Sequence, residues 1–457
     1  MSQQIITRFP PSPTGFLHIG SVRTALFNYL FAAHNKGVML LRFEDTDKER
    51  NKPEFEKDIV DGLRWLGIPY TLAENPRQSE RTAIYQKYIP KLVADGHAYE
   101  AEPQTENPSK KVVRFKNPNK KITFHDAVRG EITFDTTELG DFVIARNIDE
   151  PLYHLAVVID DHDMGVTHII RGEDHVSNTQ RQILIQEALG FARPQYAHIP
   201  LILAPDKTKM SKRHGAVSIN EYKTQGYLPE ALINYLALLG WNPGGERELY
   251  TLTELAELFT LERVHKAGAV FGTEKLQWFN HEHLKKLSDA EYAARLKEFL
   301  DKDKSDLSTF GQVRLVQLVP LLKERAKTLK EAADMLEAEL GFLGDVSYEP
   351  GLLLQNGKID AEVASNHLKA VYELIKNIPD EPHEMAASPI SRGGGFTAAQ
   401  LKDIIWPYAT SQGRGAVLWP LRVSLSGKDK SPDPFTIMGL IGKECALARI
   451  ASALEKL

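Results

Sequence analysis

The sequence predicts an α/β protein whose parallel sheet is interrupted by a small insertion and followed by an all-α second half. Three observations predict this fold class. Strand and helix patterns alternate through roughly the first 100 residues, short strand patterns cluster after Tyr99, and strand patterns vanish beyond about residue 216. The chain has 457 residues, enough for roughly three domains of ~150 residues each.

Composition restricts the class of protein. Hydrophobic residues make up 42% and charged residues 26% of the chain, which excludes a disordered or collagenous protein. No run approaches the roughly 18 to 20 apolar residues of a membrane span and no signal peptide opens the chain, so we expect a cytoplasmic protein without a membrane partner. The single cysteine, Cys445, excludes an intrachain disulfide and a multi-cysteine zinc site, so we predict no zinc and assign no metal ligands.

The first half of the sheet is built from alternating strand and helix patterns. Residues 5–9 are a predicted strand that ends at a group of prolines. Apolar residues then recur at helical spacing from Ser21, a good N-cap, to about residue 35. Residues 38–43 are an apolar run broken only by Arg42, which is typical of a strand buried on both faces of a parallel sheet. Further helices are predicted over 54–66 and 81–94.

A β-rich insertion is predicted between about residues 99 and 152. Short strand patterns over 112–115, 122–124 and 131–134 are separated by Asn-Pro and Arg-Gly turns. Seven basic residues and one acidic residue lie between Ser109 and Arg129, a bias that fits either a solvated face or contact with a polyanion. The α/β pattern then resumes, with strands predicted over 155–159, 167–171 and 199–203 and a helix over 179–189.

The second half is predicted to be helical because helical periodicity coincides with good helix formers. The predicted helices cover 229–239, 252–258, 289–300, 313–329, 331–343 and 361–375, and helical patterns resume after a Pro- and Gly-rich segment at 379–396. No internal repeat is present.

A candidate nucleotide site lies in the loop between the first strand and the first helix. In such sheets ligands bind at the carboxyl ends of the strands, and the amides at a helix N-terminus favour phosphate. Gly20 lets a ligand approach the backbone, His18 offers a donor to phosphoryl oxygens, and Ser21 begins the helix. Taken alone, this loop also fits an ordinary capped turn.

A second candidate phosphate site is the basic loop at residues 204–215, which gathers four basic residues against one acidic residue. Lys209 and Lys212, with Ser211 between them, suit the charge that develops on a triphosphate leaving group. Taken alone, it also fits an exposed loop. Together, the His-Ile-Gly-Ser and Lys-Met-Ser-Lys-Arg segments resemble the two signatures of class I aminoacyl-tRNA synthetases.

Further segments are similar to the bacterial type of glutamyl-tRNA synthetase. They are Arg8 before Pro-Ser-Pro-Thr-Gly, residues 41–47, 77–81, 153–156 with 160–162, and 170–174. The resemblance implies an interrupted Rossmann-type parallel sheet with a small α+β insertion, followed by all-α C-terminal domains. It implies ATP with Mg²⁺, L-glutamate and tRNA-Glu as substrates, a glutamate–tRNA ligase reaction through glutamyl-adenylate, and a monomer. The implied division is a catalytic domain over 1–98 and 153–215, an acceptor-binding insertion over 99–152, a helical stem-contact region over 216–310 and an anticodon-binding domain over 311–457.

The resemblance also implies roles for single residues. His18, Lys209 and Lys212 would be catalytic, and with Gly20, Ser21 and Ser211 they would bind ATP. A substrate with two carboxylates and one ammonium suits the remaining set: Arg8 and Arg171 offer guanidinium forks, Glu44 faces the ammonium, and Ser12 and Tyr153 add hydrogen bonds. The tRNA-binding candidates are Asp47, Arg50, Lys110 and Lys111. Alternatives at these positions are strand-end ion pairs for the arginines, locally capped loop carboxylates and a core tyrosine.

This sequence departs from the family pattern at three places. Ser21 stands where the class signature usually has a second His, the insertion is short and lacks zinc-binding cysteines, and the anticodon-reading residues are not assignable. The alternatives to a ligase specific for tRNA-Glu are a form that also charges tRNA-Gln, a glutaminyl-tRNA synthetase, a tRNA-modifying glutamyl-queuosine synthetase and a catalytically silent tRNA-binding homologue.

Overall fold

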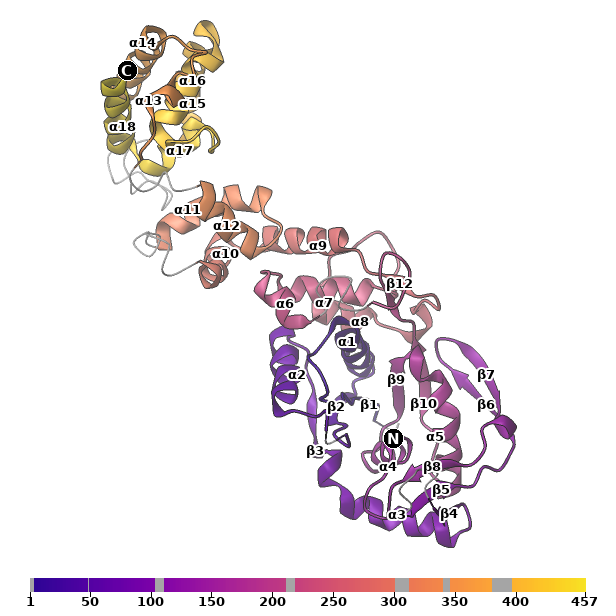
Figure 1. Cartoon of the computed structure of the whole chain (residues 1–457). Helices are drawn as coiled ribbons and strands as arrows, with labels where there is room; N and C mark the ends of the chain where they lie inside the picture. Colours follow the sequence, from indigo (N-terminus) through magenta and orange to yellow (C-terminus); the bar gives the residue numbers. More distant parts are fainter. Residues whose placement is uncertain are drawn as a thin grey trace. The chain divides into compact units, whose positions relative to one another are not determined.

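The computed structural model describes residues 4–47, 49–102, 111–210, 218–300, 312–339, 346–379 and 397–457. It divides into two compact units, unit 1 (Met1–His283) and unit 2 (Leu284–Leu457), shown in Figure 1. The five-part division expected from the sequence stays a prediction. In the described part of the chain, no helix is long and apolar enough to cross a membrane.

The first half-sheet of unit 1 is parallel and has the order β1 (Ile6–Phe9), β2 (Val38–Phe43), β3 (Thr71–Arg77). The connecting helices α1 (Ile19–His34) and α2 (Pro53–Leu66), and α3 (Thr82–Ala94) after β3, confirm the predicted helices. Helix α2 begins with a proline and ends at Gly67, whose φ of 68° suits the left-handed conformation of a helix end. The sequence did not predict β3, because most of its side chains are exposed and it contains Pro76.

The second half-sheet has the order β7 (Gly130–Asp135), β6 (Lys121–Asp126), β10 (Gln195–Ile199), β9 (His168–Gly172). Strands β9 and β10 are parallel, whereas β6 and β7 form an antiparallel hairpin. Thr167 joins this half-sheet to β1, because its amide donates to the Ile6 carbonyl at 2.9 Å and its Oγ1 accepts from the Ile6 amide at 2.9 Å. The two half-sheets are therefore separated in sequence by the insertion, but they meet through Ile6 and Thr167 in the folded chain.

The strand predicted over 155–159 is wrong, because these residues belong to helix α4 (Tyr153–Asp163). The helix is buried on all sides through Leu155–Asp161, and a continuous apolar run does not distinguish a buried helix from a buried strand. The strand predicted over 199–203 is split at Pro200 into the end of β10 and a short strand, β11 (Ile202–Leu203). Helix α5 (Val176–Leu189) confirms the predicted helix over 179–189.

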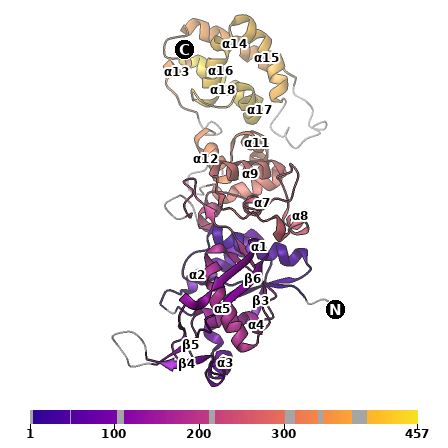
Figure 2. The same ribbon diagram turned by 90° about the vertical axis from the view of Figure 1, so that its right-hand side faces the viewer.

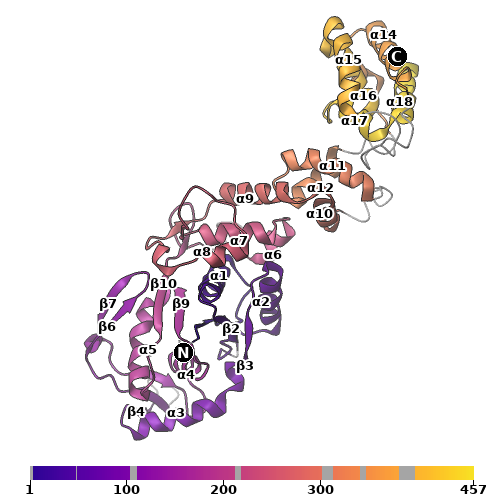
Figure 3. The same ribbon diagram turned by 180° about the vertical axis from the view of Figure 1, so that it is seen from behind.

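The inserted residues contribute to two sheets. Strands β4 (Ala98–Ala101), β5 (Val112–Phe115) and β8 (Phe142–Ala145) form a separate antiparallel sheet, while the β6–β7 hairpin extends the second half-sheet. Figure 2 shows β4 and β5 beside α3, at the end of unit 1 that lies away from α7 (Pro229–Leu238) and α8 (Leu252–Leu258), and Figure 3 shows β4 and α3 at the same end.

Helix α1 is buried between the sheet and the helices that follow the basic loop. It contacts β1, β9, α7 and α8, and residues of all these elements share one hydrophobic core. Unit 1 also contains α6 (Ile219–Thr224), β12 (Ala269–Val270), which pairs with β11, and most of α9 (Thr273–Lys286). The prediction that no strand follows residue 216 is therefore wrong, because β12 is a strand of two residues. Helix α9 was not predicted.

The described part of unit 2 is helical. Helix α10 (Asp289–Leu296) contacts α11 (Gln312–Arg325) and α12 (Leu329–Glu339), and α14 (Ala361–Lys376) contacts α16 (Arg414–Ser426) and α18 (Lys443–Lys456). The remaining helices are α13 (Pro350–Leu353), α15 (Ala398–Gln412) and α17 (Pro434–Ile441). Reciprocal capping boxes at Ser288 and Thr397 fix the starts of α10 and α15. The end of the helix predicted over 331–343 lies outside the described residues.

Candidate active site

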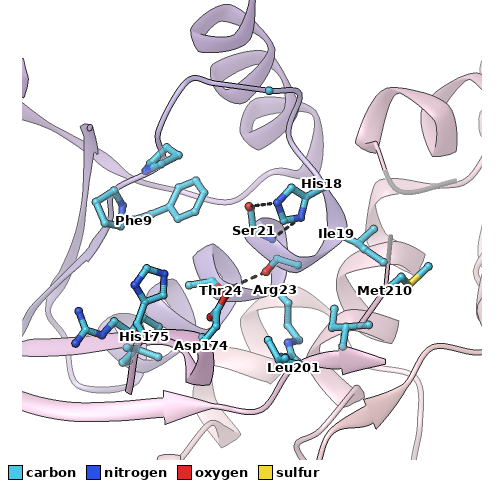
Figure 4. Close-up of a pocket in the computed structure, with 18 of the residues that line it drawn as sticks. Phe9, His18, Ile19, Ser21, Arg23, Thr24, Asp174, His175, Leu201 and Met210 are labelled. Atoms are coloured by element: carbon cyan, nitrogen blue, oxygen red, sulfur yellow. Dashed lines mark hydrogen bonds between the residues drawn. The ribbon is translucent and has the colours of Figure 1, made fainter. Parts of the chain in front are cut away.

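A cavity of about 820 Å³ opens at the carboxyl ends of β1 and β9, beside the N-terminus of α1. Eight of the predicted site residues line it: Arg8, His18, Gly20, Ser21, Glu44, Tyr153, Arg171 and Lys209. Ser12 is exposed and is not part of the lining. Ser211, Lys212 and Lys110 lie outside the described residues. Figure 4 shows side chains around this cavity, which brings Lys209 of the second predicted phosphate site together with the first phosphate site and most of the predicted glutamate site.

His18 is the N-cap residue of α1. Its Nδ1 accepts a hydrogen bond from the Ser21 amide at 3.2 Å, so the neutral ring carries its proton on Nε2, which lies 3.0 Å from the Ser21 hydroxyl oxygen (Figure 4). A Cβ at Gly20 would lie 3.2 Å from this ring, so glycine leaves room for it. Surrounding protein atoms, and then the charge of Lys209, lower the pKa of His18. Ser21 therefore holds the histidine in place.

Lys209 lies in a turn that folds back on β11. The Ala204 amide bonds the Thr208 carbonyl at 2.8 Å and the Met210 amide bonds the Ile202 carbonyl at 3.2 Å. The Lys209 ammonium reaches across the cavity edge to the Asp174 carboxylate at 3.1 Å. Partial burial opposes ionisation of Asp174, but the hydrogen bond from Lys209 holds its pKa below the ordinary value.

Two of the glutamate-binding candidates, Arg8 and Glu44, belong to a buried network of charges. Arg42 donates to Asp161 at 2.8 Å and to Glu44 at 3.1 Å, and Arg8 pairs with Asp161 at 3.4 Å. Burial disfavours the Arg42 cation, but Asp161, Asp160 and Glu44 together raise its pKa above the ordinary value. Asp160 receives further hydrogen bonds from Gln78, Arg81 and Tyr85. The network thereby joins β1 and β2 to α3 and α4.

Glu44 is the exception in this network. Burial raises the pKa of its carboxyl group to about 7, although Arg42 and Arg8 favour the ionised form. Arg42 donates a side-chain hydrogen bond to Glu44 Oε1 at 3.1 Å, and Glu44 also lines the cavity. A carboxylate that is incompletely compensated by the protein suits a cationic group of a ligand.

Arg171 is held by three hydrogen bonds. Its Nε donates to His198 Nε2 at 3.1 Å, Nη1 to Gln182 Oε1 at 2.8 Å and Nη2 to Thr179 Oγ1 at 2.8 Å. A guanidinium has five N–H donors, so two remain. His198 is fixed in turn, because its Nδ1 lies 2.6 Å from Asp126. Since Arg171 lines the cavity, its remaining donors are suited to a carboxylate.

Tyr153 and His175 form a polar pair on the cavity wall. The Tyr153 hydroxyl lies 3.1 Å from His175 Nδ1. Burial, and then the charge of Glu44, raise the pKa of Tyr153 to about 12, so its hydroxyl keeps its proton. Burial and the cation of Arg171 lower the pKa of His175 to about 4.

Comparison with known proteins agrees with this geometry. Residues 4–107 and 100–278 match the model of the catalytic domain of class I tRNA synthetases (E and Q), and residues 281–454 match an anticodon binding domain. The glutamate–tRNA ligases of Desulforamulus reducens and Aquifex aeolicus are both 39% identical to this chain. The first alignment covers 99% of this chain and 100% of the relative, and the second covers 99% of each. The chain belongs to the glutamate–tRNA ligase family.

Solved structures agree with membership in the glutamate–tRNA ligase family. The crystal structure of a glutamate tRNA ligase from Elizabethkingia meningosepticum, in complex with its amino acid, has a TM-score of 0.85 and 32% sequence identity, and the match covers 100% of both chains. The structure of the glutamate-tRNA synthetase from Elizabethkingia anophelis has a TM-score of 0.80 at the same identity. The interrupted sheet and helical second half are therefore those of this family.

Three tRNA-binding candidates of this family member, Asp47, Arg50 and Lys111, lie outside the cavity lining. Arg50 is exposed and pairs with the partly exposed Asp47 at 2.6 Å, and Lys111 pairs with Glu100 at 3.2 Å. In the part of the chain that the structure describes, no group of three or more His, Cys, Asp or Glu side chains could hold a metal ion.

Several residues in and around the cavity were given no role from the sequence. The resemblance included Asp161 and Asp174 in its motifs without giving them a role, so their motif position was an available signal. Arg23 is different, because it lies on the cavity wall and is held through carbonyl oxygens of Leu239 and Pro200, which no local pattern reveals. Burial lowers the pKa of Arg23 to about 10.

Proposed function

We propose that this protein attaches L-glutamate to the 3′ end of tRNA-Glu through a glutamyl-adenylate, using ATP with Mg²⁺. One observation carries the proposal. On one side, a single cavity holds the guanidinium groups of Arg8 and Arg171 and the carboxyl group of Glu44. On the other side it holds Lys209 and the helix N-terminus that His18 caps. A substrate with two carboxylates and one ammonium suits the first side, and a triphosphate suits the second. We assign this activity to the cytoplasm, as the site of tRNA charging, and to a monomer.

In the glutamate half, Arg8 and Arg171 would bind the carboxylates. Both guanidinium groups are buried and oriented by protein partners, so they lose little conformational entropy when a ligand binds. Glu44 would receive the ammonium, and the Tyr153 hydroxyl would add a hydrogen bond. Ser12 contributes only if its exposed loop turns toward the ligand. The side-chain placement thus favours an acidic amino acid over a neutral one.

In the ATP half, the α-carboxylate of glutamate would attack the α-phosphorus, forming a new P–O bond as the bond to pyrophosphate breaks. Gly20, Ser21 and the free amides of α1 would face phosphate, with His18 beside them. Lys209 would leave Asp174 to neutralise the pyrophosphate. Met210 and Ser218, on either side of residues 211–217, both line the cavity, which supports the same role for Ser211 and Lys212. Catalysis would thus be positioning and electrostatics.

In the second step, the 2′-hydroxyl of the terminal adenosine would attack the glutamyl carbonyl carbon. The bond to the phosphate breaks and AMP leaves, so no covalent protein intermediate is needed. Asp47, Arg50, Lys110 and Lys111 are proposed to contact tRNA. Arg50 and Lys111 are exposed and Asp47 is partly exposed, which supports this assignment.

The test is attachment of radiolabelled glutamate, with glutamine as the control, to tRNA-Glu and tRNA-Gln transcripts in the presence of ATP and Mg²⁺. Charging of tRNA-Glu alone is the expected result, and charging of both tRNAs would identify a non-discriminating ligase. Charging with glutamine, which has only its α-carboxylate, would refute the assignment of Arg8 and Arg171 to two carboxylates of the substrate. Binding of tRNA without charging by either amino acid would indicate a silent homologue.

A further inference from the structure

His175 lies where the two halves of the cavity meet. It ends the short 3₁₀ helix Glu173–His175 that follows β9, and its ring is directed into the cavity (Figure 4). Its predecessor Asp174 pairs with Lys209 on the ATP side, while the ring itself contacts Tyr153 on the glutamate side. The α-carboxylate of glutamate, which must react with ATP, would lie between Lys209 and Tyr153.

The hydrogen bonds of the ring determine which nitrogen carries its proton. Asn178 Nδ2 lies 3.2 Å from His175 Nδ1, and an amide nitrogen only donates hydrogen bonds. Nδ1 is therefore an acceptor, which leaves the proton of the neutral ring on Nε2. No hydrogen bond to Nε2 is present among the described residues, and the ring lines the cavity. His175 thus presents a neutral N–H donor toward the ligand.

We propose that His175 contacts the substrate, donating its Nε2–H to the carbonyl oxygen of the glutamyl group during transfer to tRNA. When the 2′-hydroxyl oxygen attacks the carbonyl carbon, its proton passes to the phosphate of the adenylate and negative charge collects on the carbonyl oxygen. The C=O bond then re-forms as the bond to AMP breaks. A preorganised donor aimed at that oxygen lowers the barrier of this step. The inference rests on the proposed function and assigns a further catalytic residue to it.

The environment of His175 keeps the donor neutral. Burial and the cations Arg171 and Arg8 oppose a second proton on the ring, while Asp174 favours one. A neutral donor stabilises the developing oxyanion of the transfer step without a full charge that would hold the ground-state carboxylate and slow its attack on phosphorus. The effect is therefore expected mainly in transfer and much less in adenylate formation.

The test separates the two ring nitrogens by substitution. The terminal amide of glutamine reaches about as far as Nε2, so His175→Gln keeps a donor there, whereas His175→Asn keeps a polar group only near Nδ1. His154→Gln is the matched control, because this neighbouring half-buried histidine also packs edge-on against Tyr153, at 5.2 Å between ring centroids, but is not in the cavity lining. Pyrophosphate exchange and single-turnover aminoacylation are measured with tRNA-Glu present.

The expected result is a fall of about 100-fold in the single-turnover transfer rate of His175→Asn, with exchange reduced less than about fivefold. His175→Gln should recover most of the transfer rate, and His154→Gln should remain near wild type. Wild-type transfer in His175→Asn would overturn the proposal, and so would equal losses of exchange and transfer or rescue by Asn rather than Gln. Failure of the wild-type protein to charge tRNA would instead refute the proposed function.

Discussion

The buried carboxyl group of Glu44 should make glutamate binding depend on pH near neutrality. Its pKa of about 7 means that roughly one tenth of the groups are ionised at pH 6 and roughly nine tenths at pH 8. The substrate ammonium binds the ionised form, so KM for glutamate should be about tenfold higher at pH 6 than at pH 8. The free amino acid keeps its charges across this range, which assigns the change to the protein.

Aminoacylation at saturating ATP and tRNA-Glu, measured at intervals between pH 6 and 8, tests this expectation. Glu44→Gln removes the charge at every pH, so its KM should be constant and at least about tenfold above the wild-type value at pH 8. Glu221→Gln is the matched control, because Glu221 lines the same cavity on α6 and should leave the wild-type pH dependence intact. A wild-type KM that is constant from pH 6 to 8 would refute the reasoning.

Three further predictions concern stability, tRNA binding and ATP. Asp161→Asn should lower the free energy of unfolding by about 3 to 5 kcal/mol, since Arg42 and Arg8 would lose a buried partner; denaturant unfolding that stays within about 1 kcal/mol of wild type would contradict this. Charge reversal of Lys110 and Lys111 should weaken tRNA binding and flatten its dependence on salt in a filter-binding titration, whereas unchanged binding would remove the insertion from the tRNA contact. Lys212→Ala should reduce pyrophosphate exchange by at least about 100-fold while tRNA affinity changes little, and equal losses in both would contradict its role.

The local elements of the first half-sheet could be predicted because each has its own signal. The apolar run of β2 and the helical spacing of α1 depend on neighbours in sequence. Helix α4 could not be predicted, because its buried run has the composition of a strand and only its contacts with α3 and α5 distinguish the two. Strand β3 could not be predicted for the opposite reason, because its side chains are mostly exposed and show no alternation of apolar and polar residues.

Residues that line the cavity could be predicted from the sequence better than the residues that orient their side chains. The charges of the proposed substrate are complementary to those of Arg8, Glu44 and Arg171, and all three residues lie in the motifs that resemble the family. Their partners come from distant elements: Asp161 is 153 residues from Arg8 and His198 is 27 residues from Arg171. Pairing across such separations follows from the completed sheet and not from any local pattern.

Given the proposed role of Arg8, its buried network with Asp161 and Arg42 would couple amino-acid specificity to the integrity of the core. Arg8 lines the cavity and also shares Asp161 with Arg42, so a substitution that removes its cation changes the ligand pocket and deprives a buried anion of one of two counter-charges. A lineage or an engineer seeking a ligase for a neutral amino acid would therefore have to alter α4 together with β1. Under the proposed role of Arg8, a single substitution that changes amino-acid specificity would also disturb the buried pairing of Asp161 with Arg42, although neither of these two residues lines the cavity.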